Sequence, residues 1–188
     1  MAVYNARKAA QVIAYFALKE PSKRIDVLKA VKLVYLADRE MIKEHGFPIM
    51  DEPHVSMPHG PVNSKTYSHI QGEFDLVSCG WADFLRDRAN HQVSVKHEAP
   101  LDWDELSDAE IAILNRVWDR FGGMNKWQLR DWTHDPENVP EWEDPDGSSL
   151  PIPLERIMLA VGVQNHTKQA QSVKEQYALD DVFSNLKQ

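Results

Sequence analysis

The stretch that decides the fold is Lys32-Leu33-Val34-Tyr35-Leu36-Ala37-Asp38-Arg39-Glu40, which lies inside a longer helical pattern from about Asp26 to His45. Gly46 is typical of the residue that follows a helix, and Pro48 prevents the helix from continuing. At 100° per residue, the apolar side chains share one wide face, formed by Val27, Val31, Val34, Met41 and Ile42. We therefore predict a long helix at the centre of the protein.

Asp38 falls in the middle of this apolar face. A buried carboxylate costs several kcal/mol unless it is paired or hydrogen-bonded. We expect Asp38 to be a structural acceptor, with partners among the backbone N–H groups near Gly60–Val62 or the Tyr67 hydroxyl. The alternative is a catalytic acid working with His59 or His134, although no second carboxylate or nucleophile stands beside Asp38 at a motif spacing.

The opposite face of the same helix is basic, with two leucines inside the basic stripe. A solvated charged face is the simpler interpretation, but exposed leucines among cations also suit a protein-binding surface. The stripe is formed by Lys29, Lys32, Leu33, Leu36, Arg39 and Lys43.

The rest of the chain predicts a compact, predominantly helical α+β domain with about six helices and a small antiparallel β-sheet. Caps and periodicity predict helices over residues 5–18, 62–70 with Pro61 in the first turn, 107–121, 126–133 and 154–161. Residues 92–96 alternate as a strand does, and we expect them to pair with residues 54–57. Residues 135–153 hold five of the eleven prolines and predict an irregular acidic loop that is mobile or ordered by a partner. We divide the chain into a domain over residues 1–162 and an amphipathic tail over 163–188.

Composition narrows the class of protein. The 188 residues are 43% apolar and carry a net charge of −8, so a folded core is expected, while nucleic-acid or anionic-membrane binding over the whole surface is not. The charge is unevenly distributed. Residues 1–50 carry nine basic and five acidic side chains, whereas residues 101–150 carry four basic and 13 acidic side chains. Cys79 is the single cysteine, which excludes an internal disulfide and a cysteine-based metal site. With no signal-peptide pattern and no long apolar run, we expect a cytoplasmic protein without membrane contact.

Motifs for catalysis are missing from the sequence. The eight histidines form no H-E-x-x-H, the eight glycines form no phosphate-binding loop, and there is no G-x-S-x-G. We therefore expect no metal, no cofactor and no enzymatic activity.

Four short motifs in order resemble the Panacea domain of the SocA-like antitoxin family, over about residues 8–160. They are Lys32 to Asp38 with Tyr35 between them, Gly46-Phe47-Pro48-Ile49, His59-Gly60-Pro61-Val62 with Tyr67, and Leu129 with Thr133-His134 and then Trp142. The gap before Trp142 is longer than the family pattern and holds an acidic, proline-containing insertion.

The resemblance implies an antitoxin of a bacterial or phage toxin–antitoxin system, typical of prophages and mobile elements. Such a protein neutralises a cognate toxin by direct protein–protein binding, and the toxins include translation-inhibiting, alarmone-synthetase-like proteins. The alternative that the resemblance leaves open is a proteolytic adaptor that delivers a toxin or another partner to a ClpXP-type protease.

No helix-turn-helix precedes the domain, so direct DNA binding is not expected. Two surfaces are candidates for holding the toxin: the basic stripe of the long helix, and the tail with Tyr177, Val182, Phe183 and Leu186.

Overall fold

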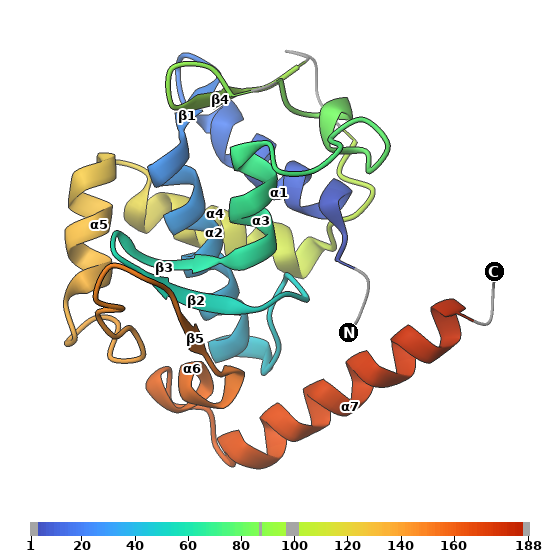
Figure 1. The fold of residues 1–188 in the computed structure, drawn as a ribbon, viewed down its shortest axis with the longest axis vertical. Helices are drawn as coiled ribbons and strands as arrows, with labels where there is room; N and C mark the ends of the chain where they lie inside the picture. Colours follow the sequence, from blue (N-terminus) through green and yellow to red (C-terminus); the bar gives the residue numbers. More distant parts are fainter. Residues whose placement is uncertain (1–3, 87, 97–101, 186–188) are drawn as a thin grey trace.

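The computed structural model describes residues 4–86, 88–96 and 102–185. Its centre is helix α2 (Val27–His45), which begins where the Asp26 side chain accepts the Leu28 N–H and ends at Gly46 in the left-handed conformation. Figure 1 shows α2 passing behind a small sheet, with other elements around it. The long central helix and both of its ends are as predicted.

Helix α2 is buried on nearly every side, so the prediction of an exposed basic stripe on this helix is wrong. Leu33 is fully buried, Leu36 is 3% exposed and Lys29 is 8% exposed. The physical reason is that helices pack against both faces: α1 (Ala6–Lys19) and α4 (Asp108–Phe121) cover one side, and α5 (Lys126–His134) another. Of the stripe, Lys43 lies exposed at the surface.

Local capping sets the boundaries of these flanking helices. Asn5 caps α1, Ser107 and Glu110 form a complete capping box at α4, and Asn125 with Gln128 forms another at α5. These caps lie at, or directly before, the helix starts that the sequence predicts at residues 5, 107 and 126. The main hydrophobic core lies between α1, α2 and α4 and includes the fully buried Ile13, Phe16 and Leu114.

The strand pairing differs from the prediction. β2 (His54–Met57) pairs with β3 (Gly60–Asn63) and β5 (Leu150–Ile152) in an antiparallel sheet of order β3-β2-β5. β4 (Gln92–Ser94) instead pairs with β1 (Arg24–Asp26), a three-residue strand too short to show alternation. Gly60, with φ +93°, makes the tight turn of the β2-β3 hairpin possible. Pro61 therefore lies in a strand, and helix α3 (Ser64–Gln71) begins later than predicted.

A 3₁₀ turn, η1 (Trp81–Asp83), lies between α3 and β4. The C-terminal part of the chain forms α6 (Leu154–Ala160) and α7 (His166–Asn185). The described residues thus form seven α-helices and two small sheets, which confirms a predominantly helical α+β fold. The start of α7 packs into a second core through Ala170 and Val173, and the helix then runs away from the body (Figure 1). The domain boundary at residue 162 stays a prediction. No helix in the described part of the chain is long and apolar enough to cross a membrane.

Candidate functional site

Four polar residues of α2, namely Lys32, Tyr35, Asp38 and Arg39, turn toward the sheet and the segment after α5. Lys32, Tyr35 and Asp38 are three positions apart, and Arg39 follows Tyr35 after four positions. At this spacing the four side chains lie on one side of the helix. Their partners come from three separate parts of the chain.

Asp38 is 1% exposed and accepts three hydrogen bonds. Its Oδ1 accepts the Met50 N–H at 3.0 Å, and its Oδ2 accepts from Asn63 Nδ2 at 2.6 Å and pairs with His54 Nε2 at 2.9 Å. The predicted partners near Gly60–Val62 and at Tyr67 are therefore wrong. Strand β2 turns His54 inward, whereas His59 is exposed at the hairpin turn. Asp38 therefore pairs with His54, and the alternative pairing with His59 or His134 is wrong as well.

Glu141 is the partner of both Tyr35 and Arg39. This carboxylate is 1% exposed, accepts the Tyr35 hydroxyl at 2.9 Å and pairs with Arg39 Nε at 2.7 Å. Arg39 also donates to the Asn138 carbonyl at 2.8 Å. Burial, and then the negative charge of Glu141, raise the pKa of Tyr35 well above its usual range.

The prediction of an irregular acidic loop over residues 135–153 is only partly right, because residues 150–152 form strand β5 and one acidic side chain of the loop is buried. Residues 135–149 contain no helix or strand, yet Val139 is fully buried and Glu141 nearly so. The reason is that Arg39 and Tyr35 supply the donors that a buried carboxylate needs.

Lys32 is fully buried and donates to the Pro61 carbonyl at 2.8 Å. Burial lowers its pKa well below the usual range. A Cβ added at Gly60 would lie 2.9 Å from Lys32 Nζ and 2.7 Å from Thr133 Oγ1. Lys32, Thr133 and the hairpin turn therefore form one tightly packed unit, in which Pro61 and Val62 are also buried.

His134 and Trp142 meet near the surface, with ring centroids 4.4 Å apart. Trp142 Nε1 donates to the Met57 carbonyl at 3.2 Å, so the longer gap before Trp142 still brings it to the hairpin. His134 Nε2 is buried without a hydrogen-bond partner among the described residues, and burial lowers the pKa of this imidazole. His59 is exposed at the hairpin turn, and Tyr67 packs half-buried against the main core.

Sequence reasoning missed four polar residues of this region: Glu141, His54, Asn63 and Glu52. Glu52 is 8% exposed and accepts the N–H and the hydroxyl of Thr66 at the start of α3. Burial raises the pKa of Glu52 to about 7. The alternation of His54-Val55-Ser56-Met57 was a usable signal for an inward His54, whereas nothing local distinguishes Glu141 from its exposed acidic neighbours.

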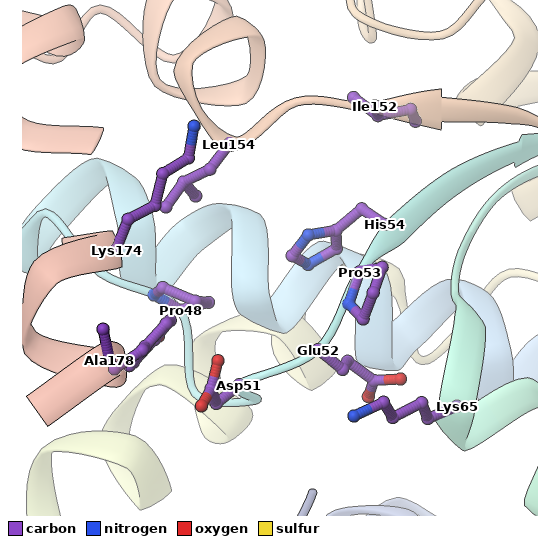
Figure 2. Close-up of a pocket in the computed structure, with 11 residues that line it drawn as sticks. Pro48, Asp51, Glu52, Pro53, His54, Lys65, Ile152, Leu154, Lys174 and Ala178 are labelled. Carbon is purple, nitrogen blue, oxygen red and sulfur yellow. The ribbon is translucent and has the colours of Figure 1, made fainter. Parts of the chain in front are cut away.

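A pocket of about 370 Å³ opens between α7, the segment before β2, and the start of α6 (Figure 2). Tyr177 of the tail lines it, half-buried.

Beyond Tyr177, the side chains of Leu179, Val182 and Phe183 are 53%, 56% and 60% exposed. Leu186 lies outside the described residues. No three His, Cys, Asp or Glu side chains in the described ranges are grouped to hold a metal ion.

One continuous stretch of the chain matches a known protein family. It contains most of α2, the β2-β3 hairpin, α5 and the segment up to Trp142. A family model described as antitoxin SocA-like, Panacea domain, matches residues 31–143, which is more than half of the chain. The chain therefore belongs to the SocA-like antitoxin family. The comparisons with curated proteins and with solved structures gave no match.

Proposed function

We propose that this protein is a non-enzymatic, cytoplasmic antitoxin that neutralises a cognate toxin by direct protein–protein binding. The observation that carries the proposal is the family match over residues 31–143. In keeping with a binding role, the polar residues on α2 are engaged in internal hydrogen bonds: Lys32, Tyr35, Asp38 and Arg39 all have buried partners. Such residues stabilise a scaffold, and binding is left to the surface.

The far end of α7 is our candidate for part of the toxin-binding surface. Leu179, Val182 and Phe183 follow the i, i+3, i+4 spacing, so they share one helix face, and each is more than half exposed. A helix face of this kind suits insertion into an apolar groove of a partner. A face of this kind, left open to water, is typical of an interaction site.

The experiment is co-expression with the product of the neighbouring reading frame, followed by affinity measurement. The triple variant Leu179→Gln, Val182→Gln and Phe183→Gln removes the apolar face and keeps helix-forming residues. The control Lys168→Gln and Glu175→Gln changes two exposed polar residues of the same helix. We expect the triple variant to weaken toxin binding at least tenfold with an unchanged melting temperature, and the control to bind normally.

Truncation of the whole tail is a poor test, because Ala170 and Val173 belong to the second core. If the triple variant binds and protects like the unchanged protein, the α7 end is excluded as the binding surface. If the neighbouring product is not toxic, the antitoxin proposal itself fails. The abundance of the toxin in cells with and without the protease separates neutralisation by binding from delivery to a ClpXP-type protease, since delivery lowers the abundance of the toxin.

A further inference from the structure

A second pocket lies beside the two-stranded sheet of β1 and β4, at the other end of the molecule from α6 and the start of α7 (Figure 1). Its volume is about 180 Å³, below the usual range for whole small-molecule ligands, so it suits one ionic group of a ligand. The charged residues of its lining are Lys23, Arg24, Arg86 and Lys96, and no carboxylate of the described residues lines it. This pocket is therefore basic in a protein whose net charge is −8.

The strand register places two arginines on either side of Ser94. Arg24 of β1 is the register partner of Ser94 of β4, and on the other side the Arg86 N–H donates to the Ser94 carbonyl at 2.9 Å. Residues that lie opposite each other in an antiparallel pair point to the same face, so the three side chains form one row. Both arginines are exposed, whereas their neighbours Ile25 and Leu85 are buried, so the row lies on the outer face.

Backbone carbonyls hold the two lysines of this pocket in place. Lys96 Nζ donates to the Ala82 carbonyl at 2.8 Å, and Lys23 Nζ donates to the Leu18 carbonyl at 2.5 Å. A carbonyl oxygen carries no net charge, and an ammonium has three donors. Each lysine therefore keeps its positive charge and further donors for a ligand.

The four cations have no counter-ion within the described part of the chain. The two carboxylates closest to Arg24 in the sequence are engaged elsewhere. Glu20 pairs with Lys29 at 2.6 Å. Asp26 pairs with Lys126 at 2.8 Å. Since like charges on neighbouring strands repel each other, an anion that lies between them is favoured.

The charge and size of the pocket indicate which anion fits. A carboxylate brings one negative charge, whereas a phosphate monoester brings about −1.5 to −2 charges and three acceptor oxygens. Two guanidiniums and two ammoniums therefore match a phosphate better, and the planar fork of arginine binds phosphate oxygens in pairs. The phosphodiesters of nucleic acid carry one charge each and need an extended basic surface, which this small pocket does not offer.

We propose that this pocket binds the terminal phosphate of a phosphomonoester, which lies between Arg24 and Arg86. Ser94, between the two arginines, offers its hydroxyl, and Lys23 and Lys96 add positive charge at the edge. The rest of the ligand lies outside the pocket. Two sources carry such a group: a small ester, such as a nucleotide or a sugar phosphate, and a phosphorylated side chain of a protein. The proposal does not rest on the proposed function.

The test is an NMR titration of the 188-residue protein with inorganic phosphate, AMP and an O-phosphoserine tripeptide. We expect saturable shifts of the backbone amides of Arg24, Arg86 and Ser94, with a Kd in the millimolar range or below. Adenosine and the unphosphorylated tripeptide should cause no shifts, and triglutamate should bind more weakly than the phosphates. Tighter binding of AMP than of inorganic phosphate identifies a small ester as the source, and tighter binding of the phosphopeptide identifies a protein.

A double variant and a matched control tie the binding to the pocket. Arg24→Gln with Arg86→Gln should weaken phosphate binding by about tenfold, because it removes the charge-assisted hydrogen bonds. Lys43→Gln with Lys168→Gln removes the same two charges at exposed positions that do not line the pocket, and binding should persist. Phosphate should raise the melting temperature of this control and leave that of the arginine variant unchanged.

The proposal is overturned if the three phosphates cause no shifts at these amides, or if the arginine variant binds them as tightly as the control does. Equal binding of triglutamate would make the pocket a site for a carboxylate of an acidic protein. Tighter binding of duplex DNA, with shifts at the same amides, would make it part of a nucleic-acid surface. Both results would overturn the assignment to a phosphomonoester.

Discussion

The hydroxyl of Tyr35 donates a 2.9 Å hydrogen bond to Oε1 of Glu141, a residue 106 positions further along the chain. Arg39, one turn after Tyr35, pairs with the same oxygen. These contacts attach the irregular segment after α5 to the central helix. Since both the carboxylate and the hydroxyl are buried, their removal affects the free energy of unfolding more than an exposed pair would.

Glu141→Ala should therefore destabilise the protein by about 3 kcal/mol, because it leaves the Tyr35 hydroxyl and the Arg39 guanidinium without their acceptor. Urea unfolding measures the loss. The control is Glu143→Ala, which removes a carboxylate paired with Arg156 that is 58% exposed, and we expect little change. Equal losses for the two variants would show that Glu141 has no special role.

Asp38→Ala should cost about 1–3 kcal/mol, because three donors in the interior lose their acceptor: the Met50 N–H, His54 and Asn63. Thermal and urea unfolding both report the loss. A variant that unfolds like the unchanged protein but no longer protects against the toxin would instead give Asp38 a direct role in binding.

Elements governed by neighbouring residues were predictable from the sequence. The caps at Asn5, Ser107 and Asn125 and the stop at Gly46 are encoded within four residues of the helix end, so the helix boundaries follow from local chemistry. The family signature also selected Lys32 and Asp38 as special positions before their partners were known.

Pairings between distant residues were not predictable. β2 and β4 both alternate, and alternation gives the inward face of a strand but not its neighbour. Glu141 is one carboxylate among many in an acidic stretch, and its burial depends on Arg39, which lies 102 positions away. The exposure of Leu33 was misjudged because periodicity cannot show that helices cover both faces of α2.

Gly60→Ala should destabilise the protein more than Gly147→Ala does. Both glycines have positive φ, +93° and +79°, so both substitutions carry a backbone cost of about 1–2 kcal/mol. At Gly60 the new Cβ also meets Thr133 and Lys32 at under 3 Å, whereas nothing lies within 4 Å at Gly147. The difference between the two melting temperatures measures the packing cost alone, and equal melting temperatures would contradict the close approach at the hairpin.

Glu52 should make stability depend on pH. The pKa of Glu52 is raised to about 7 in the folded protein from an ordinary value of 4.5, so the folded state holds a proton that the unfolded state releases. Stability should therefore fall as pH rises from about 4.5 to 7, by up to about 3 kcal/mol for this group. Glu52→Gln should lack this component, and the measurement is the difference between the unfolding free energies of the two proteins at each pH. A difference that stays constant from pH 5 to 8 would contradict the raised pKa.

Lys32 should produce a pH dependence of the same origin in the alkaline range. Burial lowers the pKa of Lys32 in the folded protein, so between that pKa and the ordinary 10.5 the unfolded state binds the extra proton. Stability should therefore rise with pH through this range, because each proton released on folding favours the folded state as protons become scarce. Lys32→Met fills a similar volume, removes the titration and loses the hydrogen bond to the Pro61 carbonyl. Lys43→Met, at an exposed position of the same helix, controls for the loss of one positive charge. We expect the stability of the unchanged protein relative to Lys32→Met to increase from pH 7 to 10. Its stability relative to Lys43→Met should stay nearly constant over the same range. Parallel curves for both variants would show that Lys32 keeps an ordinary pKa in the folded state.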